Sequence, residues 1–217
     1  MQSSTEKAKK PRGRPRAYDP EQALASATEQ FWHAGYAGTS LDDLSEATGM
    51  NRPSLYGAFG DKHALYMAAM ERYIAEGRAA IEAALADDLA LPQALMRMVD
   101  SALESYYSPS EAARGCFLIG TAVTESMDDP EVRETLNAGL RLFDRCIEAR
   151  FKRSKARGEL PADADASMLA KIAGALIYTM AMRSRAGESR AILRAMAAAG
   201  VRLICGASSV SRKRGTT

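Results

Sequence analysis

The stretch that decides the fold is residues 39–59, TSLDDLSEATGMNRPSLYGAF. It holds two short segments with helical periodicity, residues 40–48 and 52–59, which meet at a turn formed by Gly49 and Met50. Two short helices joined by a tight turn are typical of a helix-turn-helix, whose second helix enters the major groove of DNA. Spacing alone also fits any pair of short helices in a helical protein.

Polar residues stand where each of these helices is expected to begin. Ser40 and Asp43 have the spacing of a capping box, although Glu or Gln is more usual at the second of these positions. Asn51 is placed to cap the second helix, and Pro53 falls in its first turn. The sequence therefore predicts two separately capped helices.

The same segment carries side chains of the kinds that contact DNA. Base edges are read by groups near the start of the second helix, whereas hydroxyls, cations and helix N-termini bind phosphates. We expect base contacts from Asn51, Arg52, Pro53, Ser54 and Leu55, and phosphate contacts from Thr39, Ser40, Tyr56, Lys62 and His63.

Outward from this segment, the periodicity is helical almost everywhere and no run alternates as a strand does. Asp19 is placed to cap a first helix, and Asp61 a long fourth one with a possible kink near Gly77. The sequence predicts an all-α protein of about nine helices. The further helices are expected at about 20–34, 62–86, 92–107, 112–127, 130–155, 163–185 and 189–205.

The composition is that of an ordinary globular protein, with 47% hydrophobic and 26% charged residues. The longest nearly apolar run, residues 172–182, is shorter than the roughly 20 residues that cross a bilayer. The N-terminus is basic and has no apolar core of a secretory signal. We therefore expect a cytoplasmic protein that does not bind membranes.

The net charge of +2 is unevenly distributed. Residues 1–16 carry a net charge of +5 and residues 211–217 carry +3, so the rest of the chain is acidic. Within the leading arm, Gly13 to Arg16 read Gly-Arg-Pro-Arg, a sequence that fits a narrow A·T-rich minor groove. We expect Arg14 and Arg16 to contact DNA there; the alternative is a solvated tail that acts through general charge.

Residues 39–66, TSLDDLSEATGMNRPSLYGAFGDKHALY, closely resemble the TetR/AcrR family of bacterial transcriptional regulators. Tyr56, Phe59 and Lys62 occupy the positions of that family's pattern, and ALASATEQFWHAGYAGTS, which includes Phe31, also matches. The likeness covers about residues 19–67 strongly and extends to the rest only as a helical layout. It implies a homodimer that binds a near-palindromic double-stranded DNA operator and is released when a small molecule moves the fourth helix.

The resemblance also implies a division of the chain. A flexible basic arm is expected at 1–17, the helix-turn-helix domain at 18–64, a larger effector-binding and dimerisation domain at 65–207, and a disordered basic tail at 208–217. The last two helices carry apolar faces with small residues that permit close packing. These faces are expected to form the dimer interface, although they also suit internal packing. The interface residues expected are Leu169, Ile172, Leu176, Ile177, Met180, Ile192, Met196, Gly200 and Leu203.

The segment RGCFLIGTAVTES, which begins at Arg114, resembles a part of some family members that borders the ligand pocket. Aromatic, Met and hydroxyl residues here suit an apolar or aromatic ligand with one or two hydrogen bonds. The expected pocket residues are Met96, Met98, Leu103, Tyr106, Tyr107, Cys116, Phe117, Thr121 and Tyr178.

Cys116 has a second interpretation. A thiol near a helix N-terminus and an arginine has a depressed pKa, which suits a sensor of electrophiles, oxidants or a soft metal. The alternative is a small buried core residue, as most free cysteines are.

No sequence motif supports an enzyme: the chain has no GxSxG, P-loop or HExxH. The three cysteines and two histidines are too scattered for a disulfide framework or a zinc site, so we expect no catalytic residues, metal or cofactor. A helical interaction module that does not bind DNA remains the other class, but it leaves the polar second helix and the basic arm without a role.

Overall fold

The computed structural model describes residues 19–107 and 113–206, and in these ranges the secondary structure is helical apart from one isolated bridge between Tyr107 and Ala113. The expected all-α class is confirmed. The elements are α1 (Pro20–Ala34), α2 (Leu41–Thr48), α3 (Arg52–Phe59), α4 (Lys62–Ala84), α5 (Leu91–Tyr106), η1 (Leu118–Ala122, a π-helix), α6 (Val123–Glu125), α7 (Pro130–Ala156), α8 (Ala166–Arg185) and α9 (Arg190–Gly206).

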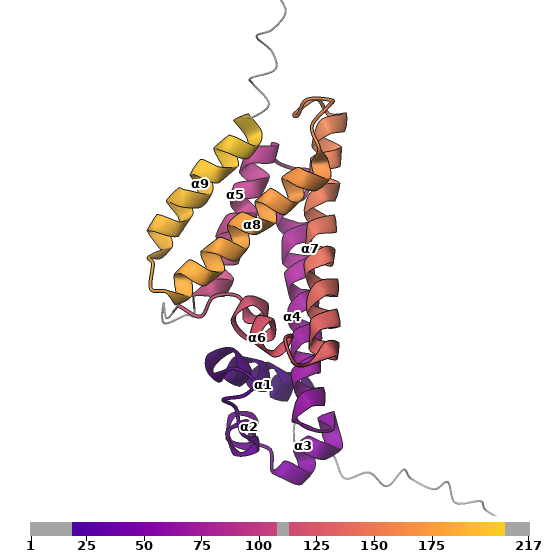
Figure 1. Ribbon diagram of the computed structural model, residues 1–217, viewed down its shortest axis with the longest axis vertical. Coiled ribbons are helices and arrows are strands. Elements are labelled where there is room, and N and C mark those ends of the chain that lie inside the picture. Colours follow the sequence, from indigo (N-terminus) through magenta and orange to yellow (C-terminus); the bar gives the residue numbers. More distant parts are fainter. Residues whose placement is uncertain (1–18, 108–112, 207–217) are drawn as a thin grey trace, which may run out of the picture.

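The helices form a small unit at one end and a larger unit above it (Figure 1). Helices α1, α2 and α3 make the small unit, and α4 runs out of it to pack along α7. Helices α5, α8 and α9 pack together in the upper part, while α8 also lies along α7. Because α4 belongs to both units, it connects them.

Particular residues end or cap the helices of the small unit. Gly49 ends α2 in the left-handed conformation at φ 66°, which glycine adopts without strain. Asp19 and Asp61 accept hydrogen bonds from the first turns of α1 and α4. These caps satisfy amide groups that have no partner inside the helix.

The segment predicted as one helix at 112–127 is instead a loop followed by η1 and α6, so that prediction is wrong. Gly115 has φ 65°, and a Cβ at this position would lie 2.7 Å from the carbonyl oxygen of Ala181. The amides of Arg114 and Gly115 donate to the carbonyl of Tyr106 and hold the loop against the end of α5. Helix α4 is continuous through Gly77 to Ala84.

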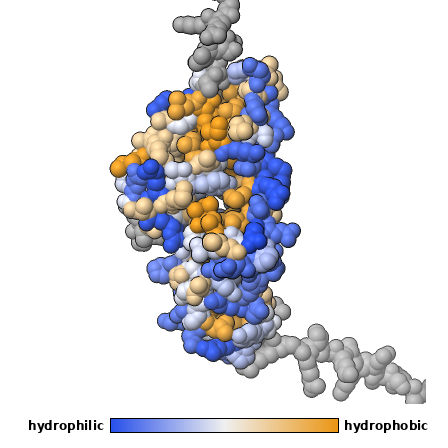
Figure 2. All heavy atoms as spheres, viewed as in Figure 1, coloured by the Kyte–Doolittle hydropathy of each residue, from blue (hydrophilic) through white to orange (hydrophobic). Residues whose placement is uncertain are grey.

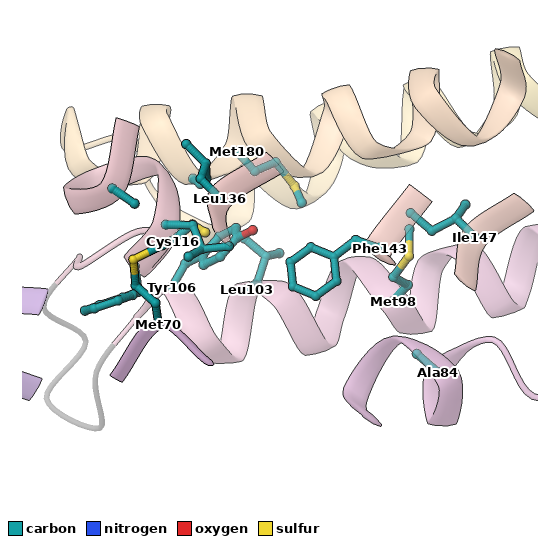
Figure 3. Packing of buried hydrophobic residues seen from close by; sticks show 14 of the residues in the cluster. Met70, Ala84, Met98, Leu103, Tyr106, Cys116, Leu136, Phe143, Ile147 and Met180 are labelled. Carbon is teal, nitrogen blue, oxygen red and sulfur yellow. The ribbon is translucent and has the colours of Figure 1, made fainter. Parts of the chain in front are cut away.

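The core of the larger unit lies between α4, α5, α7 and α8 (Figure 3). Leu103 and Met180 are fully or almost fully buried, and Phe143 of α7 lies near Met98 of α5. None of the helices in the described ranges has the length and apolarity needed to cross a membrane.

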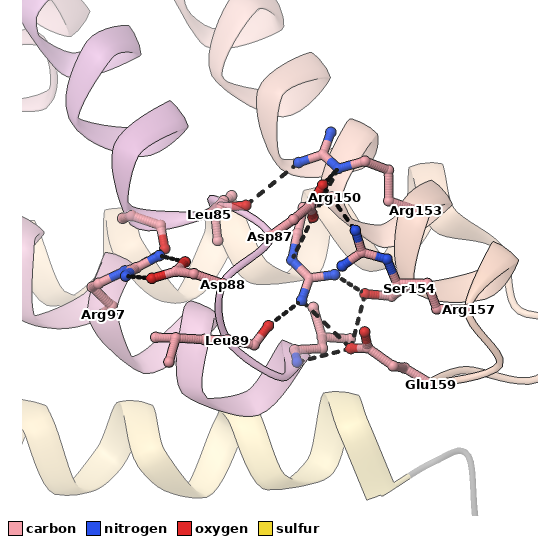
Figure 4. A network of polar contacts seen from close by, with 12 residues as sticks. Leu85, Asp87, Asp88, Leu89, Arg97, Arg150, Arg153, Ser154, Arg157 and Glu159 are labelled. Carbon is pink, nitrogen blue, oxygen red and sulfur yellow. Dashed lines mark hydrogen bonds and ion pairs between the residues drawn. The ribbon is translucent and has the colours of Figure 1, made fainter.

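A buried arginine organises the far end of this unit (Figure 4). Arg150 of α7 is fully buried; it donates to the hydroxyl of Ser154 and to the carbonyl of Leu89 at 2.8 Å. Its guanidinium also lies 3.5 Å from Glu159 and 3.8 Å from Asp87. These contacts tie the loop between α4 and α5 to α7.

Candidate nucleic-acid interface and adjoining cavity

Helices α2 and α3 meet through apolar residues. Leu44, Met50 and Leu55 are buried, which fixes the angle at which α3 leaves the turn. At the start of α2, the hydroxyl of Ser40 accepts from the Asp43 amide at 3.1 Å, and the Asp43 carboxylate accepts from the Ser40 amide at 2.7 Å. The bonds that the Ser40 amide and hydroxyl donate to the Asp43 carboxylate keep its pKa below the ordinary value. The capping box that the spacing predicts is complete.

The outer face of α3 is polar and open to solvent. Arg52 and Pro53 are exposed, and Tyr56 retains 47% of its surface. The side-chain oxygen of Asn51 accepts from the Ser54 amide at 2.9 Å, so Asn51 caps the helix from its exposed end. This face is the part of the small unit that has the shape and chemistry to enter a groove of DNA.

Arg52 is held by a neighbour on α2. Its guanidinium lies 2.6 Å from the carboxylate of Asp42, and both side chains are more than half exposed. The hydrogen bond to Asp42 raises the pKa of Arg52. A base or phosphate that binds Arg52 therefore competes with Asp42, and the pair orients the guanidinium on the outer face until then.

Three of the side chains expected to contact DNA make contacts inside the protein. Leu55 is buried with 3% exposure and packs inside, so its predicted base contact is wrong. Thr39 is also buried, with its hydroxyl donating to the Gly35 carbonyl at 2.7 Å, so a phosphate contact there would use the backbone at the start of α2, as expected for a helix N-terminus. Lys62 donates to the Thr39 carbonyl at 2.7 Å and lies 4.3 Å from the Tyr36 ring centroid, so it fastens α4 to the start of α2.

His63 contacts the larger unit. Its Nε2 lies 2.8 Å from the carboxylate of Asp129, the residue that caps α7. The phosphate contact of His63 stays a prediction, and a phosphate there would compete with Asp129. Arg14 and Arg16, expected in the minor groove, lie outside the described residues.

A cavity of about 280 Å³ lies directly above the small unit. Of the residues expected to line a pocket, Met98, Tyr106, Cys116 and Tyr178 line this cavity.

The other five expected pocket residues have different positions. Leu103, Phe117 and Thr121 are buried in the core, and Thr121 lies 2.8 Å from the hydroxyl of Tyr66. Met96 packs against the core, and Tyr107 donates its hydroxyl to the Glu188 carbonyl at 2.6 Å. They do not line this cavity, so their predicted place there is corrected.

Cys116 lies in the cavity wall, but its chemistry is opposite to the sensor prediction. Burial raises the pKa of its thiol, while the hydroxyl of Tyr73, 3.2 Å from the sulfur, lowers the pKa less. The thiol is therefore protonated near neutral pH. Arg114 does not depress the pKa because its guanidinium points to Glu29 on α1.

Sequence reasoning missed the wall that α1 and α4 contribute. Glu29 and Trp32 of α1, and Tyr73, Glu76 and Gly77 of α4, all line the cavity. The one available signal was Gly77, a small residue that leaves room against Phe143: a Cβ there would lie 2.9 Å from the ring.

The expected dimer residues divide into exposed and internal ones. Ile172, Ile192 and Leu203 are at least 44% exposed, and apolar surface gathers over the upper unit (Figure 2). Met180 is completely buried within the protomer, so its predicted place in an interface is wrong. Gly200 makes room for Leu176, whose side chain would lie 2.5 Å from a Cβ there.

The remaining three are only partly buried. Leu169 and Met196 pack against the edge of the core, and Ile177 lines the cavity.

A solvent-exposed polar helix, held by a capped partner helix below a larger helical unit, defines a helix-turn-helix DNA-binding regulator. The family model described as bacterial regulatory proteins, tetR family, matches residues 23–69, and the model described as tetracyclin repressor-like, C-terminal domain, matches residues 92–199. The chain belongs to the TetR family of transcriptional regulators.

Individual relatives agree with this assignment. The chain is 34% identical over 200 residues to the HTH-type transcriptional repressor ComR of Escherichia coli (strain K12), covering 92% of this chain and 95% of ComR. It is 30% identical to the uncharacterized HTH-type transcriptional regulator YezE of Bacillus subtilis (strain 168), over 73% of this chain and 82% of YezE. These relatives are regulators of transcription and not enzymes.

A solved structure extends the likeness to a complex with DNA. A cysteine mutant of the TetR family regulator CifR, complexed with 26-bp double-strand operator DNA, superposes with a TM-score of 0.80. The two chains are 29% identical, and the match covers 88% of this chain and 98% of that one.

Proposed function

We propose that the protein is a homodimeric repressor that binds a near-palindromic operator and is released from it by a small molecule. The observation that carries this proposal is the position of the cavity, because α1 of the DNA-binding unit forms part of its wall through Glu29 and Trp32. A molecule in the cavity touches the unit that presents α3. ComR bears the name of a repressor, and CifR binds operator DNA in its solved complex.

Release by a ligand requires a difference in affinity between two states. The ligand must bind the state that cannot bind DNA more tightly than the state that can, and by reciprocity operator DNA weakens ligand binding by the same factor. Helix α1 packs against both α2 and α4, so a shift of α1 changes the position of α3 on the DNA.

The dimer is supported by the apolar surface of α8 and α9. Ile172 on α8 and Ile192 and Leu203 on α9 keep large side chains in solvent, and a symmetric pair of such faces is the commonest way to bury them. A two-fold dimer places two copies of α3 in successive major grooves, about 34 Å apart.

Footprinting on the DNA that flanks the protein's own gene tests the function. We expect protection of a near-palindrome that weakens as salt rises. Arg52→Ala should weaken the protection about tenfold or more, whereas Arg141→Ala, at an exposed position of α7 outside the small unit, should keep it. No protection at low salt would refute the proposal, and a monomer in sedimentation at micromolar concentration would refute the dimer.

The basic arm has its own test. Removal of residues 1–16 should weaken operator binding and flatten its dependence on salt, because the arm would release counterions when it enters the minor groove. Unchanged affinity would leave the arm without a role in binding.

A further inference from the structure

The cavity is built from both units of the protein. Trp32 of α1 forms one side, Tyr73 of α4 and Phe143 of α7 form others, and Met98 and Ile177 add aliphatic surface. Most of the wall is therefore aromatic or aliphatic, which favours an apolar occupant.

The charged residues in the wall already have partners. Glu29 lies 2.6 Å from the guanidinium of Arg114, which is also in the wall. Glu76 lies 2.9 Å from Arg72, one turn before it on α4. A charged ligand would lose its hydration here and find no unpaired opposite charge among the described wall residues, which makes its burial costly.

One polar group in the wall is unsatisfied. The hydroxyl of Tyr178 is buried, and within the described ranges it has no hydrogen-bond partner. A buried hydroxyl without a partner is unfavourable. The Tyr178 ring must shift for a ligand to reach this hydroxyl, and a ligand with a hydrogen-bonding atom that does so gains affinity that a pure hydrocarbon does not.

The volume limits the size of the occupant. An apolar cavity of about 150 Å³ accepts benzene, and this one is about 280 Å³. It therefore accommodates a compact molecule of roughly ten to twelve non-hydrogen atoms and is too small to enclose a long chain completely.

We propose that the effector of this protein is a compact, uncharged and mainly apolar molecule with one hydrogen-bonding group, bound between Trp32 of α1 and Tyr178 of α8. This inference rests on the proposed function and names the chemical class that its cavity accepts. It also places the ligand against the DNA-binding unit itself, so that occupation of the cavity acts on α1 directly.

Three molecules that share one cage test the class in the full chain without DNA. Camphor is neutral and has one carbonyl, bornane-2-carboxylate is an anion of similar size, and bornylamine is a cation at neutral pH. Trp32 is the only tryptophan of the chain, so its emission reports on the cavity wall. We expect camphor to change the emission with an affinity at least about tenfold higher than that of either charged molecule.

Two substitutions locate the site. Ala102→Leu fills the cavity from α5 and should weaken camphor binding about tenfold or more, whereas Ala83→Leu, at an exposed position of α4 outside the cavity, should not change it. Tyr178→Phe should weaken camphor about tenfold by removing the donor to its carbonyl. Circular dichroism and thermal unfolding show that each variant is folded before its affinity is compared.

The outcomes separate this inference from the proposed function. Three outcomes would overturn the inference: tighter binding of either charged molecule, no binding of camphor, or unchanged binding by Ala102→Leu. None of them would refute the repressor proposal if the operator is still protected. If camphor binds as expected but no operator is protected, the ligand class holds and the repressor proposal fails. Camphor binding that weakens the footprint of the wild-type protein supports both.

Discussion

The guanidinium carbon of Arg114 lies 4.0 Å from the centroid of the Trp32 ring, and the Trp32 indole N–H donates to the carbonyls of Arg114 and Gly115 at 3.1 Å. Arg114 also binds Glu29 at 2.6 Å and donates to the Ser105 carbonyl at 2.9 Å. One side chain therefore fastens α1 of the DNA-binding unit to the end of α5 and to the loop before η1.

Arg114→Gln should loosen this connection. It removes the stacking on Trp32 and the ion pair with Glu29, and we expect a loss of about 1–3 kcal/mol in the free energy of unfolding, measured in urea. The emission of Trp32 should shift as the ring gains contact with water. Arg141→Gln is the control, because Arg141 is exposed and makes a 3.3 Å bond within its own helix. Equal stability of Arg114→Gln and wild type would contradict the role given to Arg114.

The buried guanidinium of Arg150 predicts a larger effect at the other end of the molecule (Figure 4). Arg150→Met removes the donor to the Leu89 carbonyl and the cation beside Glu159, and we expect a loss of roughly 2–4 kcal/mol in urea unfolding. Arg153 also contacts Asp87, which lies near Arg150, but 44% of the Arg153 side chain is exposed. Arg153→Met should therefore cost less than about 1 kcal/mol. A reversed order would show that burial does not decide the contribution.

Helix caps and turn residues made most of the fold predictable. Asp19, Asn51 and Asp61 cap the helices that the sequence places after them, and Gly49 ends α2 at the expected turn. The failure lies at 112–127, where apolar residues on all sides indicate a buried helix. The local pattern does not reveal that Gly115 must fit against the Ala181 carbonyl, a residue distant in sequence.

The candidate site was predictable only in its exposed part. The outer face of α3 follows from helix periodicity and from the polar residues near Asn51. By contrast, the contact of Trp32 with Arg114 spans 82 residues of sequence, and no local pattern joins them. Likewise, no local pattern shows that the fold brings Asp129 within 2.8 Å of His63.

Alkaline pH should destabilise the protein through Tyr66. Burial raises the pKa of Tyr66 from 10.0 to about 12, because the phenolate is disfavoured away from water. The stabilising contribution is therefore complete below about pH 10 and is lost as pH rises toward about 12. Tyr66→Phe should reduce the fall in the free energy of unfolding by up to about 1.4 kcal/mol per pH unit in this window. Tyr56→Phe, on the exposed face of α3, should keep the wild-type slope; equal slopes for all three proteins would contradict the assignment.

The pair of Arg52 and Asp42 predicts opposite effects of two substitutions on operator affinity. Arg52→Gln removes a donor from the outer face of α3 and should weaken binding about tenfold or more. Asp42→Asn frees the guanidinium from its partner at 2.6 Å and removes a negative charge near the phosphates, so binding should strengthen several-fold. Fluorescence anisotropy with the footprinted DNA measures both. Weaker binding by Asp42→Asn would mean that the ion pair orients Arg52 for DNA instead of competing with it.

The three thiols should react at different rates in the folded protein. Burial raises the pKa of Cys116, and only 5% of the residue is exposed, so a disulfide-exchange reagent should reach it only after unfolding. Cys146 and Cys205 are partly exposed. Cys116→Ser should therefore leave the native reaction unchanged and lower only the total measured in denaturant, whereas Cys146→Ser should reduce the native reaction. If Cys116→Ser also removed a native phase, Cys116 would be an accessible thiol, and a sensor role at the cavity wall would regain its chemical basis.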